Sequence, residues 1–454
     1  MLKALALALA SATVVVLSVS VSADKAPTDP PRRPNILVIV TDDQRAGEGT
    51  LRVMPRTRRW LMDKGTRFPN AVSTTPLCCP ARASIFSGRY AHNHGVFTNL
   101  GRLRFRHRFT VQHYLNKAGY KTAMAGKFFN NWNVEKQPPF FDKWSIFNGG
   151  YYHRPFNVDG SMRTIPKYST DYLSDRSVDM LRDFETSDAR PWFLYVAPYG
   201  PHAPFTPARR HRDDEVPYWN GNPAVFEKNR GDKPAYVHLR NETYKTWRRN
   251  RRIQLRSLMS IDELVGDIRR TVLDLEESRN TLVFYLSDNG YMWADHGLYD
   301  KGAPYTPSVR IPFLLSYPAG PSLSPVDSRL AGNIDIAPTI LDAAGISQDP
   351  RHPMDGTSLF QEPWKRNRIL AEYRNNDNRW TPPTWASTRT HEFQYTEYYD
   401  NGKRIFREYY DLRRDPWQLR NRLGDDTKSN DPPTLRLLSK QLEADRRCSG
   451  ASCP

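Results

Sequence analysis

Two short apolar runs limit the folds that this chain can adopt. Asn35–Val40 and Thr281–Leu286 are apolar almost without interruption, so neither shows the alternation of a strand with one face in water. Runs of this kind are typical of strands that are buried on both faces, as in a parallel sheet covered by helices. The sequence therefore predicts a sheet at the centre of a layered α/β domain.

The segments between and after these runs alternate between strand-like and helix-like patterns. Further strands are predicted at 120–124, 192–197 and 311–316, and amphipathic helices at 173–184, 253–275 and 334–344. This alternation over most of the chain predicts a doubly wound, mostly parallel sheet flanked by helices. We assign residues 24–366 to this domain.

From residue 367 onward the pattern changes. The aromatic-rich runs 392–399 and 403–410 alternate polar and apolar residues, and Asp400-Asn401-Gly402 between them is a strong hairpin signal. A helix is expected at 435–444. Residues 367–454 are therefore predicted to form a smaller subdomain with an antiparallel sheet.

The first 23 residues have the pattern of a signal peptide. Lys3 precedes an apolar stretch from Ala4 to Val21, and Val21-Ser22-Ala23 fits a cleavage site. The alternative is an uncleaved membrane anchor, although the stretch is near the lower limit for crossing a bilayer. We expect a secreted protein without stable membrane insertion; retention in the cell envelope is also compatible. In an oxidising compartment, Cys448 and Cys453 are expected to pair.

Polar side chains follow both apolar runs. Asp42 and Asp43 come shortly after the first run, and Asp288 and Asn289 shortly after the second. Because ligands of open α/β sheets bind at the carboxyl ends of strands, these four side chains are candidates for one site. Their oxygens suit calcium or magnesium. From spacing alone, loop caps and turn formers are an equally good interpretation.

The chain is strongly basic, with 66 Lys and Arg against 49 Asp and Glu, a formal charge of +17. This excess favours an anionic partner but does not separate nucleic acid, membrane surface, sulfated glycan or phosphate ester. Basic runs at 56–59, 102–108 and 248–252 could line a polyanion path or form solvated faces. No nucleic-acid-binding motif accompanies them, so nucleic acid is not expected as a partner.

One segment carries a specific resemblance. Residues 76–90 resemble the signature of the type I sulfatases, which is Cys-x-Pro-x-Arg followed by a short helix and Gly. The matching residues are Cys78, Pro80, Arg82 and Gly88. The type I sulfatases are the formylglycine-dependent members of the alkaline phosphatase superfamily. Other segments resemble the family's motifs in the family's order: 41–44, 126–127, 201–205, 287–290, 301–305, 333–339, 354–359 and 410–416.

The resemblance implies a chemistry and a role for each matching residue. Cys78 would be converted by a formylglycine-generating enzyme to an aldehyde, whose hydrate attacks sulfur and forms a covalent sulfo-enzyme intermediate. Calcium, or alternatively magnesium, would be held by Asp42, Asp43, Asp288, Asn289 and the modified Cys78. Arg82 would hold the formylglycine, Lys127 and Lys301 would bind sulfate oxygens, and His202 would serve the leaving oxygen. Asp288 is also a candidate base.

Phe129 departs from the family pattern, because many relatives have a histidine there that helps to release sulfate. His92 and His94 are the candidate replacements and weak candidates for substrate binding. Together with the Leu-Cys-Cys-Pro segment, this departure looks most like the N-acetylglucosamine-6-sulfatases and heparan 6-O-sulfatases. The resemblance thus implies a sulfuric ester hydrolase acting on a sulfated carbohydrate, such as a glycosaminoglycan, or on an aryl sulfate. The alternatives are a phosphodiesterase or phosphonate hydrolase of the same superfamily and a non-catalytic basic glycan-binding protein.

Overall fold

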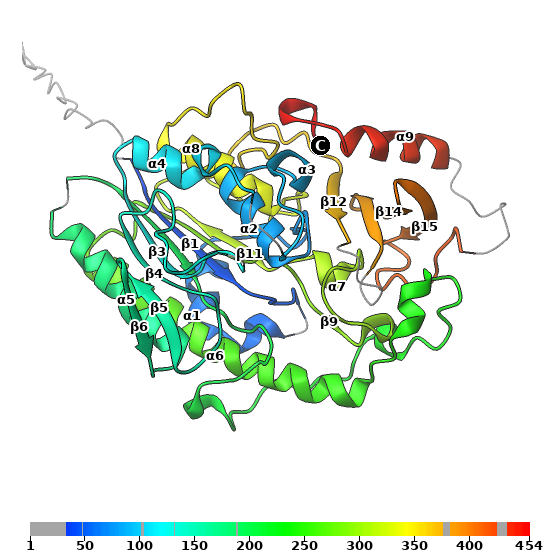
Figure 1. Ribbon diagram of the computed structural model, residues 1–454, viewed down its shortest axis with the longest axis horizontal. Helices are drawn as coiled ribbons and strands as arrows, with labels where there is room; N and C mark the ends of the chain where they lie inside the picture. Colours follow the sequence, from blue (N-terminus) through cyan, green and yellow to red (C-terminus); the bar gives the residue numbers. More distant parts are fainter. Residues whose placement is uncertain are drawn as a thin grey trace, which may run out of the picture. The chain divides into compact units, whose positions relative to one another are not determined.

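The centre of the computed structural model is a nine-stranded sheet with the order β2-β11-β8-β1-β7-β3-β4-β5-β6 (Figure 1). Its strands are β1 (Asn35–Thr41), β2 (Thr66–Arg67), β3 (Lys121–Lys127), β4 (Lys143–Phe147), β5 (Arg154–Val158), β6 (Ser161–Ile165), β7 (Trp192–Ala197), β8 (Thr281–Ser287) and β11 (Phe313–Ser316). Strands β8, β1, β7, β3 and β4 are parallel, and the flanking strands are antiparallel. The predicted doubly wound, mostly parallel sheet is confirmed.

Helices cover both faces of this sheet. Alternate residues of a strand point to opposite faces, and in the central strands both sets of residues are apolar, so both faces need to be covered. In β1, Ile36, Val38 and Val40 pack in one core with α2 (Cys78–Ser87), α4 (Val111–Lys117) and α8 (Ile336–Ala344). Leu37 and Ile39 pack in a second core with α5 (Ser169–Glu185) and α6 (Tyr244–Asp274). The short helices are α1 (Pro55–Thr57), α3 (Ala91–His94) and α7 (Thr306–Val309). Every residue of β1 is buried, as its uninterrupted apolar sequence requires.

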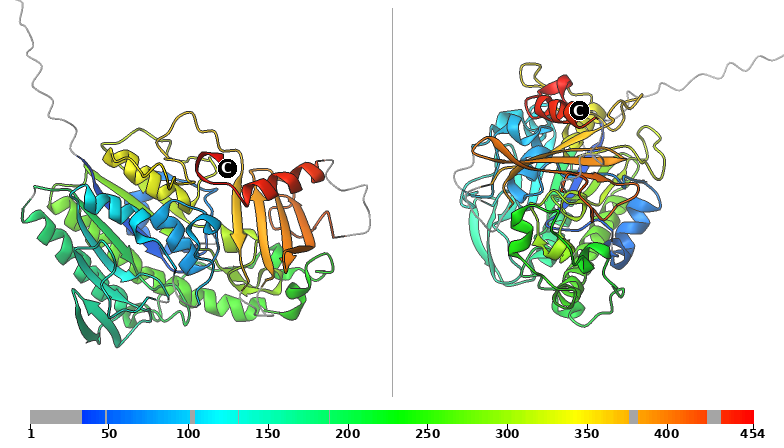
Figure 2. Two further views of the ribbon diagram at one scale, coloured as in Figure 1. Left: turned by 45° about the horizontal axis from the view of Figure 1, so that its top comes forward. Right: turned by 90° about the vertical axis from the view of Figure 1, so that its right-hand side faces the viewer.

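A second, four-stranded sheet is antiparallel throughout and follows the large one in sequence. It consists of β12 (Ile369–Tyr373), β13 (Thr384–Arg389), β14 (Phe393–Asp400) and β15 (Lys403–Asp411), in that order. Asn401 and Gly402 have φ values of 46° and 78°, as a tight two-residue hairpin turn requires. Helix α9 (Leu435–Asp445) lies beside this sheet (Figure 2). Its Leu438 and Leu442 belong to the same hydrophobic cluster as Leu370, Ala386 and Tyr395 of the sheet. A small hairpin, β9 (Met292–Trp293) and β10 (Tyr299–Asp300), lies in sequence between β8 and β11 of the large sheet.

The structure describes residues 33–47, 49–100, 104–130, 132–187, 189–375, 382–424 and 434–454. The predicted signal peptide, residues 1–23, lies outside this range. Residues 33–454 form one compact unit, and the division at residue 367 stays a prediction. The expected disulfide between Cys448 and Cys453 is present. Within the described segments, no helix has both the length and the apolar character needed to cross a bilayer.

Candidate active site

The ends of β1 and β8 bring the two polar pairs together. These strands are parallel neighbours and end side by side, so the residues that follow them share one edge of the sheet. The backbone N–H of Asp43 donates to Asp288 Oδ1 at 3.2 Å, and Asn289 Nδ2 donates to Asp43 Oδ1 at 2.7 Å. The side chains of Asp42, Asp43, Asp288 and Asn289 are all buried. The predicted convergence of these four residues is therefore a feature of the structure.

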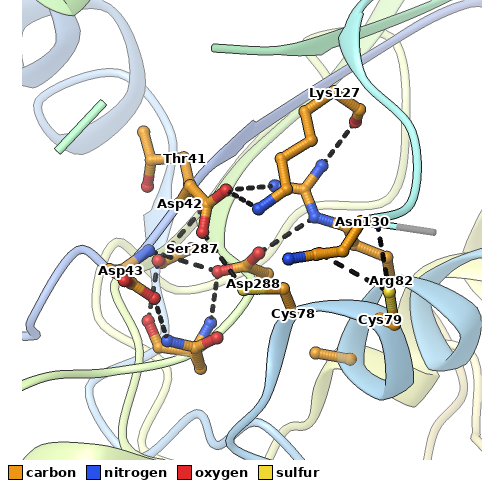
Figure 3. A network of polar contacts seen from close by, with 12 residues as sticks. Thr41, Asp42, Asp43, Cys78, Cys79, Arg82, Lys127, Asn130, Ser287 and Asp288 are labelled. Carbon is orange, nitrogen blue, oxygen red and sulfur yellow. Dashed lines mark hydrogen bonds and ion pairs between the residues drawn. The ribbon is translucent and has the colours of Figure 1, made fainter. Parts of the chain in front are cut away.

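Helix α2 places Cys78 and Arg82 against this acidic edge. Cys78 is the first residue of α2, and its Sγ lies 3.4 Å from Asp42 Oδ1. One turn later, Arg82 Nε lies 3.0 Å from Asp288 Oδ2 and NH2 lies 3.4 Å from Asp42 Oδ2. Arg82 NH1 also donates to the carbonyl oxygen of Lys127 at 2.5 Å. Figure 3 shows Asp42, Asp288 and Arg82 facing one another beside Cys78.

Two lysines from separate elements add positive charge to the cluster. Lys127 is the last residue of β3, and its Nζ forms an ion pair with Asp42. Lys301 directly follows β10; its Nζ forms an ion pair with Asp43 and lies 2.9 Å from Cys78 Sγ. Both ammonium groups therefore lie next to the carboxylates around Cys78. Three cations and three carboxylates meet here, an arrangement that can bind both a metal ion and a tetrahedral anion.

His202 approaches the cluster from the loop after β7. Its Nδ1 lies 2.8 Å from the carbonyl oxygen of Ala203, which can only accept, so Nδ1 carries the hydrogen of this bond. Its Nε2 lies 3.6 Å from Asp43 Oδ2. The imidazole is the most exposed group of the cluster, with 23% of the side chain accessible. His202 is therefore the member of the cluster that solvent reaches most easily.

Burial and charge shift the pKa values in opposite directions across the site. For Asp42, burial opposes ionisation, but Lys127, His202 and Arg82 outweigh it and hold the pKa well below its usual range. Burial, with Asp42 nearby, raises the pKa of Asp288 to about 6. Burial and the charge of Asp42 also raise the pKa of the Cys78 thiol. Reactive cysteine nucleophiles have lowered pKa values, so an unmodified Cys78 lacks that activation.

The donor atoms in the cluster fit a metal ion. Asp42, Asp43, Cys78 and His202 each offer one ligand atom, and these atoms lie within 4.8 Å of one another. Asn289 Oδ1 is buried and has no hydrogen-bond partner among the residues that the structure describes. A buried carbonyl oxygen without a partner is costly unless another group satisfies it. Carboxylate and amide oxygens are the ligands of hard divalent cations.

The structure places His92 and His94 outside this cluster. His92 Nδ1 lies 2.9 Å from Glu372 Oε1, and its Nε2 lies 3.0 Å from the carbonyl oxygen of Cys448. His94 Nε2 lies 3.1 Å from Ser84 Oγ in α2, and burial lowers the pKa of His94 to about 3. Within the described residues, neither imidazole makes a hydrogen bond or ion pair with the cluster. A direct role for them in binding substrate stays a prediction.

Phe129 belongs to an aromatic core rather than to the cluster. It is fully buried, and its ring centroid lies 6.0 Å from that of Phe86 in α2 and 5.5 Å from that of Phe105. The residue that replaces the histidine of many relatives thus supports the helix that carries Cys78.

Three neighbours of the site could not be predicted from the sequence. Asn99 Oδ1 accepts from the backbone N–H of Cys79 at 2.8 Å, which fixes the first turn of α2. Ser73 Oγ donates to the carbonyl oxygen of Asp288 at 2.7 Å. Lys127 Nζ lies 5.6 Å from the centroid of the Tyr199 ring. These residues lie in loops without a motif, and only the tertiary fold brings them here.

Comparison with known proteins identifies the family. The model of the family described as Sulfatase matches residues 34–346. The chain belongs to the sulfatase family. A second model, described as N-sulphoglucosamine sulphohydrolase, C-terminal, matches residues 294–447. The predicted membership among the sulfuric ester hydrolases is confirmed.

Individual members of the sulfatase family resemble most of the chain. The human N-acetylglucosamine-6-sulfatase is 29% identical over 93% of this chain and 86% of its own length. The Extracellular sulfatase SULF-1 homolog of Drosophila melanogaster is 34% identical over 75% of this chain, but this match spans only 32% of that relative.

Two solved structures share the fold. One is a protein in complex with its substrate D-glucosamine-2-N,6-O-disulfate, with a TM-score of 0.76 and 23% identity, covering 92% of this chain and 98% of that one. The other is the phosphonate monoester hydrolase of Silicibacter pomeroyi, with a TM-score of 0.72 and 20% identity, covering 92% of this chain and 96% of that one.

Proposed function

We propose that the chain is a secreted sulfatase that hydrolyses a sulfate ester of a sugar, with formylglycine made from Cys78 as its nucleophile and a covalent sulfo-enzyme intermediate. The observation that carries this proposal is the convergence of Cys78, Lys127 and Lys301 with His202 and three carboxylates at one edge of the sheet. A formylglycine-generating enzyme would be the partner that matures Cys78. Conversion to an aldehyde would also remove the need for a thiolate.

We further propose that Asp42, Asp43, Asp288, Asn289 and the modified Cys78 hold calcium, with magnesium as the alternative. Two observations support this ligand set. Asn289 Oδ1 has no hydrogen-bond partner in the described part of the chain, and the other side chains would also offer oxygen atoms. When bound, the cation supplies Lewis-acid polarisation of the sulfate group.

The remaining side chains have separate tasks. Lys127 and Lys301 bind the equatorial sulfate oxygens and neutralise the charge that they carry in the transition state. Arg82, held by Asp288 and Asp42, positions the modified Cys78 at the start of α2. His202 donates a proton from Nε2 to the departing oxygen, while its Nδ1 bond to Ala203 keeps the ring in place.

The proposed substrate is a glucosamine-type sugar with a sulfate on its 6-O position. The names of the human relative and of the ligand in the similar solved structure both contain such a group. A phosphonate or phosphodiester substrate is the second candidate, because a phosphonate monoester hydrolase shares the fold. Sulfate and phosphonate groups are both tetrahedral, so the geometry of the cluster accommodates either.

The test compares the hydrolysis of N-acetylglucosamine-6-sulfate, an aryl sulfate, an aryl phosphodiester and an aryl phosphonate monoester by the purified protein. We expect the sulfate esters to be preferred. Cys78→Ala should abolish this turnover, whereas Cys79→Ala should retain it, because the Cys79 sulfur faces Asn130. A strong preference for the phosphorus esters would refute the sulfatase assignment. Glycan binding that survives Cys78→Ala, with no ester hydrolysed by the unsubstituted protein, would favour the non-catalytic alternative.

Secretion rests on the signal-peptide pattern and on the name of the extracellular Drosophila relative. The mature chain is expected to begin at Asp24. N-terminal sequencing of protein recovered from the medium tests this, and an intact Met1 would contradict it.

A further inference from the structure

The amino-terminal half of α6 has an unusual charge distribution. The first 13 residues of this helix contain six cations: Lys245, Arg248, Arg249, Arg251, Arg252 and Arg256. The first acidic residue of the helix is Asp262. The amino end of a helix is the positive end of its dipole, so a cation in the first turn, such as Lys245, is unfavourable. Like charges four residues apart also repel each other. Helix stability therefore does not explain these residues.

Three of these arginines form a row on one side of α6. Arg248, Arg252 and Arg256 are spaced by four residues, which is about 6 Å along a helix. Arg248 and Arg252 are exposed, and Arg256 is partly exposed. We call these three residues the arginine row. Arg251 faces the other way: it is 2% exposed, and its NH1 donates to the carbonyl oxygen of Pro217 at 2.8 Å.

The arginine row and the loop 213–219 enclose a cavity of about 400 Å³. Tyr218 lines this cavity together with Arg248, and its side chain is 73% exposed. Trp219 also lines the cavity and is buried. The cavity thus offers an exposed aromatic ring next to guanidinium groups.

The arginine row is not neutralised by neighbouring carboxylates. Asp213 and Glu215 line the same cavity, yet in the described parts of the chain no acidic oxygen lies within 4.0 Å of a nitrogen of these three guanidinium groups. Nearby Arg210 differs, because it pairs with both Asp171 and Glu263. The cavity therefore carries a net positive charge that the surrounding fold leaves uncompensated.

We propose that this cavity is a second binding site, which holds a sulfated polysaccharide chain away from the catalytic cluster. The fork of a guanidinium group matches two oxygens of a sulfate, and a row of such groups matches a chain with repeated sulfates. The ring of Tyr218 offers a flat apolar surface for a sugar ring. No residue of the cavity belongs to the cluster around Cys78. That the polymer is a sulfated glycan rests on the proposed function.

The test uses the full-length protein with Arg248, Arg252 and Arg256 all changed to Gln. The control changes three exposed arginines elsewhere to Gln: Arg163 in β6, Arg182 in α5 and Arg190 before β7. Binding of a fluorescent heparin fragment is measured as a function of salt, with double-stranded DNA of similar length as the comparison probe. Turnover of an aryl sulfate and the melting temperature are measured in parallel.

We expect the triple variant to bind heparin at least about tenfold more weakly and with a shallower salt dependence, because fewer counterions are released. Its melting temperature should stay the same or rise, since repulsion in α6 is relieved. Tyr218→Ala should weaken heparin binding as well. Aryl sulfate turnover should change by less than about twofold, because the cluster is not touched.

Unchanged heparin binding in the triple variant, or an equal loss in the control, would overturn the proposal. DNA binding that is as tight as heparin binding and equally sensitive to the triple variant would overturn the assignment to sulfated glycans. These binding results do not depend on catalysis. If the protein bound heparin through the arginine row but hydrolysed no sulfate ester, only the proposed function would fail.

Discussion

Binding of calcium should stabilise the fold by a measurable amount. Asp42, Asp43 and Asp288 are buried, and Asn289 Oδ1 has no partner among the residues described. A cation that binds only the folded state adds about 2.7 kcal/mol to the free energy of unfolding at a concentration 100 times its Kd. Removal of the ion with a chelator should take this stabilisation away.

The expected change in melting temperature follows from the size of the protein. An unfolding entropy of about 2.1 cal/mol/K per residue gives roughly 0.9 kcal/mol/K for residues 33–454. A stabilisation of about 2.7 kcal/mol therefore raises the melting temperature by about 3 °C. The assay is differential scanning calorimetry of chelator-treated protein, titrated with calcium and separately with magnesium.

Two buried asparagines provide the matched comparison. Asn289→Ala removes the partnerless oxygen and should abolish most of the calcium-dependent shift. Asn333→Ala removes a buried amide whose Oδ1 already accepts from the backbone N–H and hydroxyl of Thr74. The control should lower the melting temperature by leaving these donors unpaired, yet keep the shift. The absence of a shift in the unsubstituted protein, or an undiminished shift in Asn289→Ala, would refute the metal assignment.

Three further predictions concern the leaving group, the C-terminal disulfide and a buried ion pair. His202→Ala should lower kcat/KM for N-acetylglucosamine-6-sulfate by about 10²–10⁴-fold. The loss should be much smaller for an aryl sulfate, because its phenolate leaving group needs no proton. Equal losses for the two substrates in steady-state assays would contradict this role. Replacement of Cys448 and Cys453 by Ser should lower the free energy of unfolding by about 2 kcal/mol, because the disulfide closes a short loop in the unfolded chain; an unchanged midpoint in urea would argue against it. Burial disfavours the charged form of His92, but its bond to Glu372 raises the pKa above the usual value of about 6.5. The stability from this pair should therefore be present in full below about pH 6.5 and be lost as the pH rises through the raised pKa. Melting temperatures from pH 5 to 9 should show this loss, and His92→Gln should remove it; identical pH profiles would count against the pair.

Much of the central sheet could be predicted because its strands are buried on both faces. β7 spans the predicted residues 192–197, and β1 and β8 each extend one residue beyond the predicted run. The sequence does not predict β5 or the edge strand β6, because both are short and the residues of β6 are mostly exposed. A strand at the edge of a sheet needs no continuous apolar pattern, so the sequence carries little signal for it.

The candidate site was predictable where the strand ends carry acidic residues and where the sulfatase motifs occur. The placement of His92 was not, because its partners Glu372 and Cys448 lie 280 and 356 positions away in sequence. Such long-range contacts leave no local pattern. The aromatic packing of Phe129 has the same origin, since it depends on Phe86 and Phe105 meeting on one side of the sheet.

The most direct test of the central claim is mass spectrometry of the peptide that contains Cys78, after expression in a host with a formylglycine-generating enzyme. The account predicts the mass of an aldehyde in place of the Cys78 thiol, with Cys79 unchanged. Substitution of Pro80 or Arg82, which complete the motif, should reduce this modification. A peptide that contains only the two thiols under these conditions would contradict the proposed nucleophile.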